Sequence, residues 1–278
     1  MSFNVKRELT ADMDRNKNGF WSSTSSMDWC EENYTVSPFI AEWWNTLTNL
    51  NYILLSLVGF WSAYQTKSET RTYFLYLAAL AIGLGSFAFH MTLTYEMQLS
   101  DELPMIFGTA FHLYCGINIF RSSNVFSIII LSVVSMGIIV HYLVTFDFAF
   151  FETAFMMMLI AGGLFPLYHI WTMSKTHPGH SRQLLRLFGL VYFGYIFGYT
   201  LWNIDNLKCE ELRAVRDKVG VFSFLFQFHG WWHLFTGLGA FTSDTLVQYM
   251  RLIVLGRKGI MIKWLGPYPV VVAKSKGE

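Results

Sequence analysis

Seven long apolar stretches are the feature that most constrains the fold of this chain. They cover residues 40–64, 73–93, 99–120, 124–145, 149–173, 184–204 and 221–243. Each reaches the ~20 residues that an α-helix needs to cross the hydrocarbon core of a bilayer. The chain is 53% hydrophobic and only 14% charged, which is typical of a polytopic membrane protein. We therefore predict an all-α integral membrane protein, a bundle of seven transmembrane helices.

The positions of lysine and arginine orient this bundle. Basic residues follow the first, third and fifth stretches and fill the C-terminal tail, which by the positive-inside rule places the tail in the cytosol and the N-terminus in a lumen. The loop between the sixth and seventh stretches argues the other way with four basic residues, which four acidic residues balance. The expected parts are a luminal segment (1–39), the seven-helix bundle (40–243) and a cytosolic tail (244–278). A net charge of +1 gives no reason to expect nucleic acid as a partner.

Five polar side chains near the ends of these stretches predict a site in one leaflet. His229 and His233 are four residues apart, so they share a helix face, where two imidazoles can hold one metal ion or hydrogen-bond neighbouring helices. His90 closes the second stretch, with Ser86 one turn before it, and Asp101 opens the third stretch across a short loop, where it can also serve as a helix cap. At ~1.5 Å per residue all five fall within a few turns of one side. Ionisable groups in a membrane are functional by default, which favours a shared site.

The remaining histidines carry no such pattern. His112, His141 and His169 occur singly in their stretches, without a partner at helical spacing, and His177 and His180 lie in an expected cytosolic loop. We interpret all five as hydrogen-bonded or solvated.

The segment before the first stretch is rich in side-chain oxygen atoms. Five such side chains occur between Asp28 and Glu42, a number that suits calcium, which prefers six to eight oxygen ligands. The alternative is a solvated acidic loop, and the spacing is not that of an EF-hand. Asn33-Tyr34-Thr35 is also a glycosylation sequon. A glycan and a metal cannot both occupy Asn33, and we favour the metal.

Two of the three cysteines fall on the expected luminal side. Cys30 and Cys209 are the natural disulfide partners in an oxidising lumen, although two unpaired thiols are the alternative. Cys115 lies within the third stretch.

Four blocks of sequence carry a family resemblance: Asp28–Asn45, Gly85–Met105, Trp202–Glu210 and Gln227–Gly239. In these blocks the chain resembles the alkaline ceramidases, closest to their phytoceramidase branch. That family belongs to a superfamily of seven-span membrane hydrolases that also includes the adiponectin receptors. The resemblance extends from about residue 18 to residue 242.

The resemblance implies an intramembrane zinc-dependent amidase of the endoplasmic reticulum or Golgi membrane. Its substrate would be the N-acyl bond of ceramide, dihydroceramide or phytoceramide, and its products a sphingoid base and a free fatty acid. Zinc would be held by His90, His229 and His233, with water in the fourth place. Asp101 would act on that water, and Ser86 would stabilise the developing oxyanion.

The resemblance also implies a second metal and a disulfide. A structural or regulatory calcium ion would be held by Asp28, the backbone carbonyl of Trp29, Glu31, Asn33 and Glu42, and Cys30 would pair with Cys209. The alternative function is a seven-span lipid-sensing receptor with a structural zinc, which predicts lipid binding without turnover. An open zinc position beside a carboxylate argues for the hydrolase.

Overall fold

The computed structural model describes residues 19–274, and its chain divides into two compact units. The first unit comprises the residues up to Leu54, Ala81–Glu102 and Gly194–Gly237. The second comprises Leu55–Leu80, Leu103–Phe193 and the residues from Leu238 onward. All residues of the predicted site lie in the first unit.

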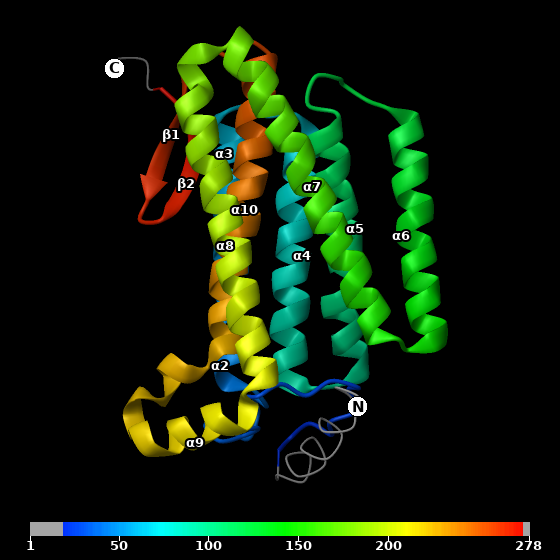
Figure 1. Ribbon diagram of the computed structural model, residues 1–278, viewed down its shortest axis with the longest axis vertical. Helices are drawn as coiled ribbons and strands as arrows, with labels where there is room; N and C mark the ends of the chain where they lie inside the picture. Colours follow the sequence, from blue (N-terminus) through cyan, green and yellow to red (C-terminus); the bar gives the residue numbers. More distant parts are fainter. Residues whose placement is uncertain (1–18, 275–278) are drawn as a thin grey trace. The chain divides into compact units, whose positions relative to one another are not determined.

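Helices form most of the described chain, and one β-hairpin follows them (Figure 1). The helices are α2 (Trp43–Thr48), α3 (Leu50–Gln65), α4 (Thr70–Thr92), α5 (Tyr95–Ile117), α6 (Val125–Thr145), α7 (Phe148–Thr176), the short η1 (Pro178–His180), α8 (Ser181–Leu207), α9 (Cys209–Val219), the short η2 (Gly220–Phe226) and α10 (Phe228–Val254). The hairpin consists of β1 (Ile260–Leu265) and β2 (Tyr268–Ala273).

Four helices in the described chain are long and apolar enough to cross a membrane, which makes this a multi-pass membrane protein. They are α4, α6, α7 and the segment Pro178–Leu207 that contains α8. The other three predicted stretches also form helices, but α3 has only 16 residues, and α5 and α10 contain charged side chains within their length. Hydropathy therefore identifies a membrane-spanning helix most clearly where that helix carries few polar groups.

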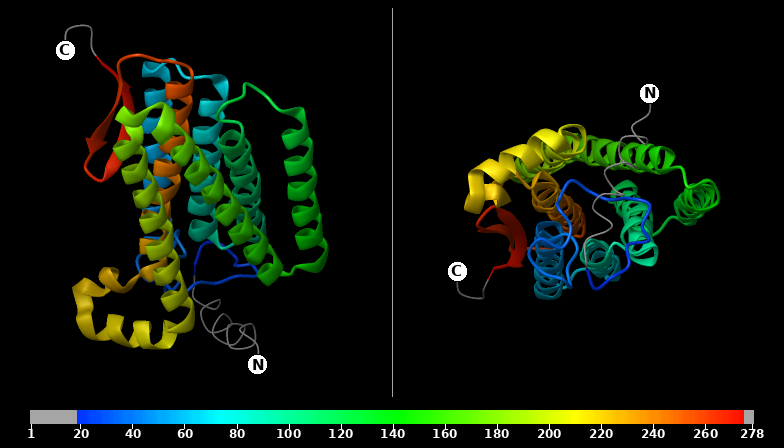
Figure 2. Two further views of the ribbon diagram at one scale, coloured as in Figure 1. Left: turned by 45° about the horizontal axis from the view of Figure 1, so that its top comes forward. Right: turned by 90° about the horizontal axis from the view of Figure 1, so that it is seen from below.

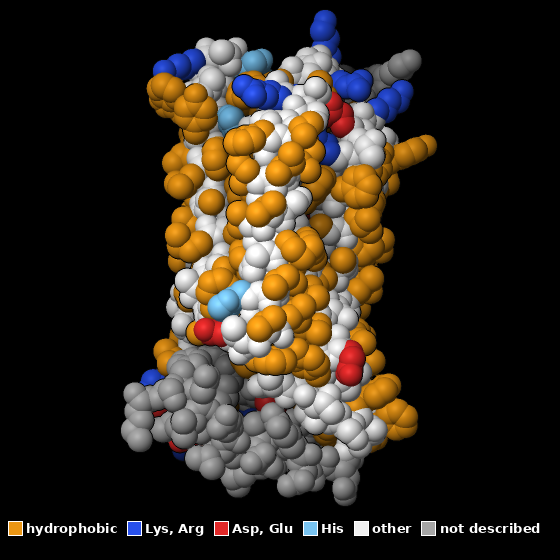
Figure 3. All heavy atoms as spheres, turned by 90° about the vertical axis from the view of Figure 1, so that its right-hand side faces the viewer, with side chains coloured by type: hydrophobic (Ala, Val, Ile, Leu, Met, Phe, Trp, Pro, Cys, Tyr) orange, Lys and Arg blue, Asp and Glu red, His pale blue; other side chains and the backbone are white. Residues whose placement is uncertain are grey.

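α6 presents the plainest lipid-facing surface. Val133 and Val144 are among many large apolar side chains that are exposed along this helix. Figure 3 views the second unit from the side of α6, where hydrophobic side chains cover the helix. Such a surface is stable only against hydrocarbon, so α6 is expected to face lipid.

α10 differs from the predicted seventh stretch, 221–243, because it begins at Phe228 and continues to Val254. The polar residues that ended the apolar pattern have partners inside the second unit. Asp244 lies 2.8 Å from Nδ1 of His112, whose Nε2 is 3.0 Å from the Ser243 hydroxyl, and Gln248 accepts from Tyr76 at 2.7 Å. Arg251 donates to Glu69 at 2.9 Å. Since these groups are satisfied internally, the helix extends through them.

The C-terminal β-hairpin corrects the all-α expectation. β1 and β2 pair antiparallel around a turn in which Gly266 has φ +60°, a conformation that favours glycine. Figure 2 shows the hairpin lying alongside α10. Val271 of β2 is fully buried against α10 side chains such as Met250, and its carbonyl accepts from Ser62 of α3 at 2.7 Å. Part of the predicted tail thus belongs to the core of the second unit.

In the first unit, the N-terminal segment is fastened to the end of α4. The backbone N–H groups of Ala41 and Glu42 donate to the carbonyls of Met91 and His90, at 2.9 and 3.0 Å. The N–H of Ser25 donates to Leu93 at 3.0 Å. These bonds hold the oxygen-rich segment directly beside the helix end that carries His90.

Candidate metal centre

Three histidines from two helices meet in the first unit. His90 comes from the last turn of α4, and His229 and His233 come from the first two turns of α10, where their i, i+4 spacing puts both rings on one face. The ring centroids are 4.7 to 5.0 Å apart, and one nitrogen from each ring can be chosen so that all three lie within 4.8 Å of one another. All three side chains are buried. This arrangement can hold one metal ion.

Neighbouring polar groups fix the orientation of two of these rings. Nδ1 of His90 is hydrogen-bonded to the carboxylate of Glu42, which is fully buried. Nδ1 of His233 lies 3.0 Å from the hydroxyl of Thr48 and 3.4 Å from the amide nitrogen of Asn49. Both rings therefore keep Nε2 for a ligand. Metal-binding histidines are commonly oriented in this way through their other nitrogen.

His229 is held by a stacked ring and a backbone bond. Its ring lies 4.1 Å from that of Trp29, centroid to centroid, at 39°. The backbone N–H of His229 donates to the buried carboxylate of Asp205 at 3.3 Å. The first turn of α10 is thus capped by a side chain from α8, which fits the negative charge preferred at a helix start.

The donor set fits zinc. Three buried imidazoles are a ligand set that zinc, copper, iron and nickel accept, and three protein ligands with one open position are typical of catalytic zinc. The three histidines each offer a ring nitrogen close enough to the other two for one metal ion to be held between them.

Ser86 and Asp101 lie together, as the sequence predicts. Ser86 is buried on α4, one turn before His90, and its hydroxyl lies near the Asp101 carboxyl on α5. Gly85 permits this approach, because a Cβ there would lie 1.9 Å from the carbonyl oxygen of Ser100. Asp101 is half-buried, and the adjacent Glu102 is buried and accepts from Gln98 at 2.9 Å.

The oxygen-rich segment is buried, so it is not the solvated loop that was the alternative. Asp28, Glu31, Asn33 and Glu42 are all buried. Glu31 accepts from the backbone N–H groups of Trp44 and Asn45, at 2.7 and 2.8 Å, and so caps the start of α2. Glu42 accepts from the N–H of Trp29 at 3.0 Å. Both carboxylates are thus hydrogen-bonded to backbone N–H groups of this part of the chain.

Two observations indicate that this cluster suits a cation. The amide nitrogen of Asn33 donates to Asp28 at 3.1 Å, while its buried amide oxygen has no donor among the described residues. Burial, together with the negative charge of Glu42, raises the pKa of Glu31 to about 8. A bound cation would supply the partner that the Asn33 amide oxygen lacks and would stabilise the ionised form of Glu31, since buried oxygen atoms need a donor or a metal. The burial of Asn33 leaves no room for a glycan in the folded chain.

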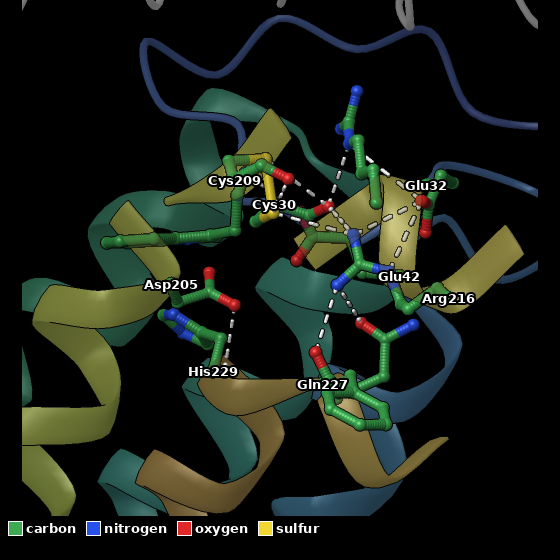
Figure 4. The surroundings of a disulfide bond; sticks show 11 residues. Cys30, Glu32, Glu42, Asp205, Cys209, Arg216, Gln227 and His229 are labelled. Atoms are coloured by element: carbon green, nitrogen blue, oxygen red, sulfur yellow. Dashed lines mark hydrogen bonds and ion pairs between the residues drawn. A yellow bond between two sulfur atoms is a disulfide. The ribbon is translucent and has the colours of Figure 1, made fainter. Parts of the chain in front are cut away.

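A disulfide and one arginine join this segment to α9 (Figure 4). Cys30 and Cys209 are bonded, with their Cα atoms 5.4 Å apart. The guanidinium of Arg216, buried in α9, donates to the carbonyl of Cys30 at 2.7 Å, to Glu32 at 3.1 Å and to the side-chain oxygen of Gln227 at 3.2 Å. Gln227 precedes α10, so Arg216 connects the oxygen cluster with the start of the histidine helix.

Several of these positioning residues were not predicted. Thr48 and Asn49 lie in the first predicted stretch and Arg216 lies in the loop before the seventh, and nothing in their spacing points to the histidines. Polar side chains at the mouth of an apolar stretch are the one signal that could have drawn attention to Thr48 and Asn49.

Comparison with known proteins assigns the family. The family model described as Ceramidase matches residues 22–272. Alkaline ceramidase 3 of Mus musculus is 36% identical over 262 residues, which is 92% of this chain and 95% of that protein. Alkaline ceramidase YPC1 of Saccharomyces cerevisiae is 32% identical, over 85% of this chain and 80% of its own length. Alkaline ceramidase of Arabidopsis thaliana is 25% identical, over 93% of this chain and 97% of its own length. With a family match across nearly its whole length and a buried histidine trio within it, this chain belongs to the ceramidase family of hydrolases.

Proposed function

We propose that this protein hydrolyses the N-acyl bond of ceramides at a zinc centre inside the membrane, releasing a sphingoid base and a free fatty acid. The observation that carries the proposal is the trio His90, His229 and His233, buried and oriented, in a chain of the ceramidase family. Ceramide, dihydroceramide and phytoceramide share the amide bond that such a site would cleave.

The side chains near the trio have the chemistry that amide hydrolysis needs. Zinc, when bound, would lower the pKa of a water molecule and polarise the acyl carbonyl. Asp101 would take the proton that the water loses as its oxygen attacks the acyl carbon, and would pass it to the amine nitrogen as the C–N bond breaks. The Ser86 hydroxyl would donate to the carbonyl oxygen as negative charge builds there. The closeness of the Ser86 hydroxyl to the Asp101 carboxyl supports this pairing of roles.

The oxygen cluster would hold a structural or regulatory calcium ion. Its ligands would be Asp28, the carbonyl of Trp29, Glu31, Asn33 and Glu42. The buried amide oxygen of Asn33 supports this assignment. Glu42 also contacts His90, so calcium would stabilise the metal centre through a shared side chain.

The helices would cross the membrane seven times, with the N-terminus in the lumen of the endoplasmic reticulum or Golgi and the C-terminus in the cytosol. α3, α5 and α10 would join the four apolar helices as spans because their charged and polar side chains have partners inside the protein. The Cys30–Cys209 disulfide supports a luminal N-terminus, since disulfides persist in oxidising compartments.

The test is release of fatty acid from a long-chain ceramide by the purified protein in detergent, with zinc measured on the same samples. The parent protein should hold zinc and turn over substrate. His229→Ala should lose both, while His141→Ala, which changes an exposed histidine on α6, should keep both. A parent protein that holds zinc and binds ceramide without releasing fatty acid would overturn the proposal and favour the lipid receptor.

The calcium assignment has its own matched pair of variants. Asn33→Ala removes the amide ligand and the sequon together, whereas Thr35→Ala removes the sequon alone. Calcium should protect the parent and Thr35→Ala from thermal unfolding, and should protect Asn33→Ala much less. Equal protection of all three proteins would exclude Asn33 as a ligand.

A further inference from the structure

The short helix η2 (Gly220–Phe226) carries an exposed apolar surface that the metal centre does not use. Its side chains Val221, Phe222, Phe224 and Leu225 are 84%, 59%, 39% and 44% exposed. Four large apolar side chains within five residues form a contiguous patch, which water does not tolerate without an apolar partner.

The segment before η2 has the pattern of an interfacial helix. α8, which lies in a candidate membrane span, ends at Leu207, and α9 follows after one residue. α9 buries Leu212 toward the protein and exposes charged side chains of both signs along its other face: Glu210, Glu211, Asp217 and Lys218. Since charged side chains avoid hydrocarbon, a charged helix that directly follows a membrane span is expected at the level of the lipid headgroups.

Contacts with the first unit hold the backbone of η2 in place while its side chains point outward. The carbonyl of Leu225 accepts from the indole N–H of Trp231 at 3.1 Å, and the carbonyl of Phe226 accepts from Arg216 at 3.1 Å. The ring of Phe224 lies 5.7 Å from that of Trp44. The apolar patch is therefore a fixed feature of the folded protein.

We propose that η2 inserts its side chains into the hydrocarbon of the leaflet that surrounds the end of α8, while α9 lies among the headgroups. The occupant is bilayer lipid, because the patch is continuous along the chain with a membrane span and is reached through a charged amphipathic helix. This gives a lipid-immersed segment whose last residue, Phe226, is three positions before His229. The inference depends on α8 being a span and is independent of ceramide hydrolysis.

Spin labels can measure this directly in the full-length protein. Cys115 is the one free cysteine among the described residues, so Cys115→Ala gives a background for single labels at Val221→Cys and Phe222→Cys. The purified proteins are reconstituted in phosphatidylcholine nanodiscs, and the accessibility of each nitroxide to oxygen and to a water-soluble nickel chelate is compared. Val133→Cys on α6 is the lipid-facing reference, and Lys218→Cys on α9 is the reference for a position outside the hydrocarbon.

We expect the labels at positions 221 and 222 to match the label at 133, with several-fold greater accessibility to oxygen than to the nickel chelate. Labels at both positions that match the label at 218 would overturn the proposal. Intact Cys30–Cys209 bonding and a monodisperse elution profile establish that each labelled protein is folded. These measurements need no substrate, so their outcome is separate from that of the activity assay.

Discussion

Glu42 accepts hydrogen bonds from Nδ1 of His90 and from the amide nitrogen of Asn45 on one carboxylate oxygen, and from the backbone N–H of Trp29 on the other. One fully buried side chain thus belongs to the oxygen cluster and also orients a member of the histidine trio. The two clusters are therefore physically continuous within the first unit.

Glu42→Gln should weaken metal binding at the histidine trio. A neutral amide orients the His90 ring less strongly than a carboxylate does, and loss of such a partner typically costs 10–100-fold in metal affinity. Competition with a zinc chelator measures the dissociation constant. Glu96→Gln, on the exposed side of α5, is the control and should bind zinc like the parent. Equal affinities for all three proteins would show that the Glu42 contact does not act on the metal.

Gly85→Ala should destabilise the protein and impair activity. Its Cβ would lie 1.9 Å from the Ser100 carbonyl, so α4 and α5 must separate where Ser86 meets Asp101. Overpacking of this kind costs roughly 1–3 kcal/mol, which lowers the apparent melting temperature by several degrees. Gly137→Ala on α6 is the matched control, because its Cβ would meet nothing within 4 Å. A melting temperature of Gly85→Ala equal to that of Gly137→Ala would contradict the close packing.

Arg216→Met should cost far more stability than Lys208→Met. The first change leaves Glu32, the Cys30 carbonyl and Gln227 without a buried guanidinium, a loss on the order of 3 kcal/mol. Lys208 pairs with Glu211 where both side chains are 63% exposed, and such pairs contribute about 0–1 kcal/mol. Thermal unfolding in detergent compares the two variants. Equal shifts would mean that Arg216 does not tie α9 to the N-terminal segment.

Stability on the acid side should depend on Glu69. The hydrogen bonds from Arg251, joined by those from Arg71, hold the pKa of Glu69 at about 2, below its ordinary value of 4.5. Between these two pKa values the unfolded chain binds the proton more readily than the folded chain does. The contribution of Glu69 to the free energy of unfolding is therefore full above about pH 5 and is lost as pH falls toward 2. Glu69→Gln should therefore be less stable than the parent near pH 7 and show a shallower loss of stability below pH 5. Parallel curves for the two proteins would contradict this prediction.

The sequence was most informative about features that follow from local pattern alone, namely the apolar helices and the spacing of histidines along a helix. Within residues 19–274, each of the seven apolar stretches contains helix, and four of the helices are long and apolar enough to cross a membrane. The i, i+4 spacing of His229 and His233, with the position of His90 at the end of another stretch, was enough to predict that these histidines share a site, while their selection as the metal ligands came from the family resemblance. The prediction of a shared site needed only helix geometry and connectivity.

The sequence was least informative where distant groups satisfy one another. Asp244, Gln248 and Arg251 looked like the end of a span and the start of a tail, yet each has a partner on another helix of the second unit. Thr48 is 185 residues from the His233 ring that it orients. Tertiary approach creates these pairs, and no local periodicity encodes them.

The β-hairpin has a practical consequence for anyone who shortens or extends this chain. Val270, Val271 and Val272 complete two apolar clusters that include side chains of α3, α4 and α10. Removing the residues after Leu255 would uncover those clusters and the Ser62 hydroxyl, and would favour self-association in detergent. An affinity tag fused after the last residue, beyond the end of β2 at Ala273, would leave the hairpin intact.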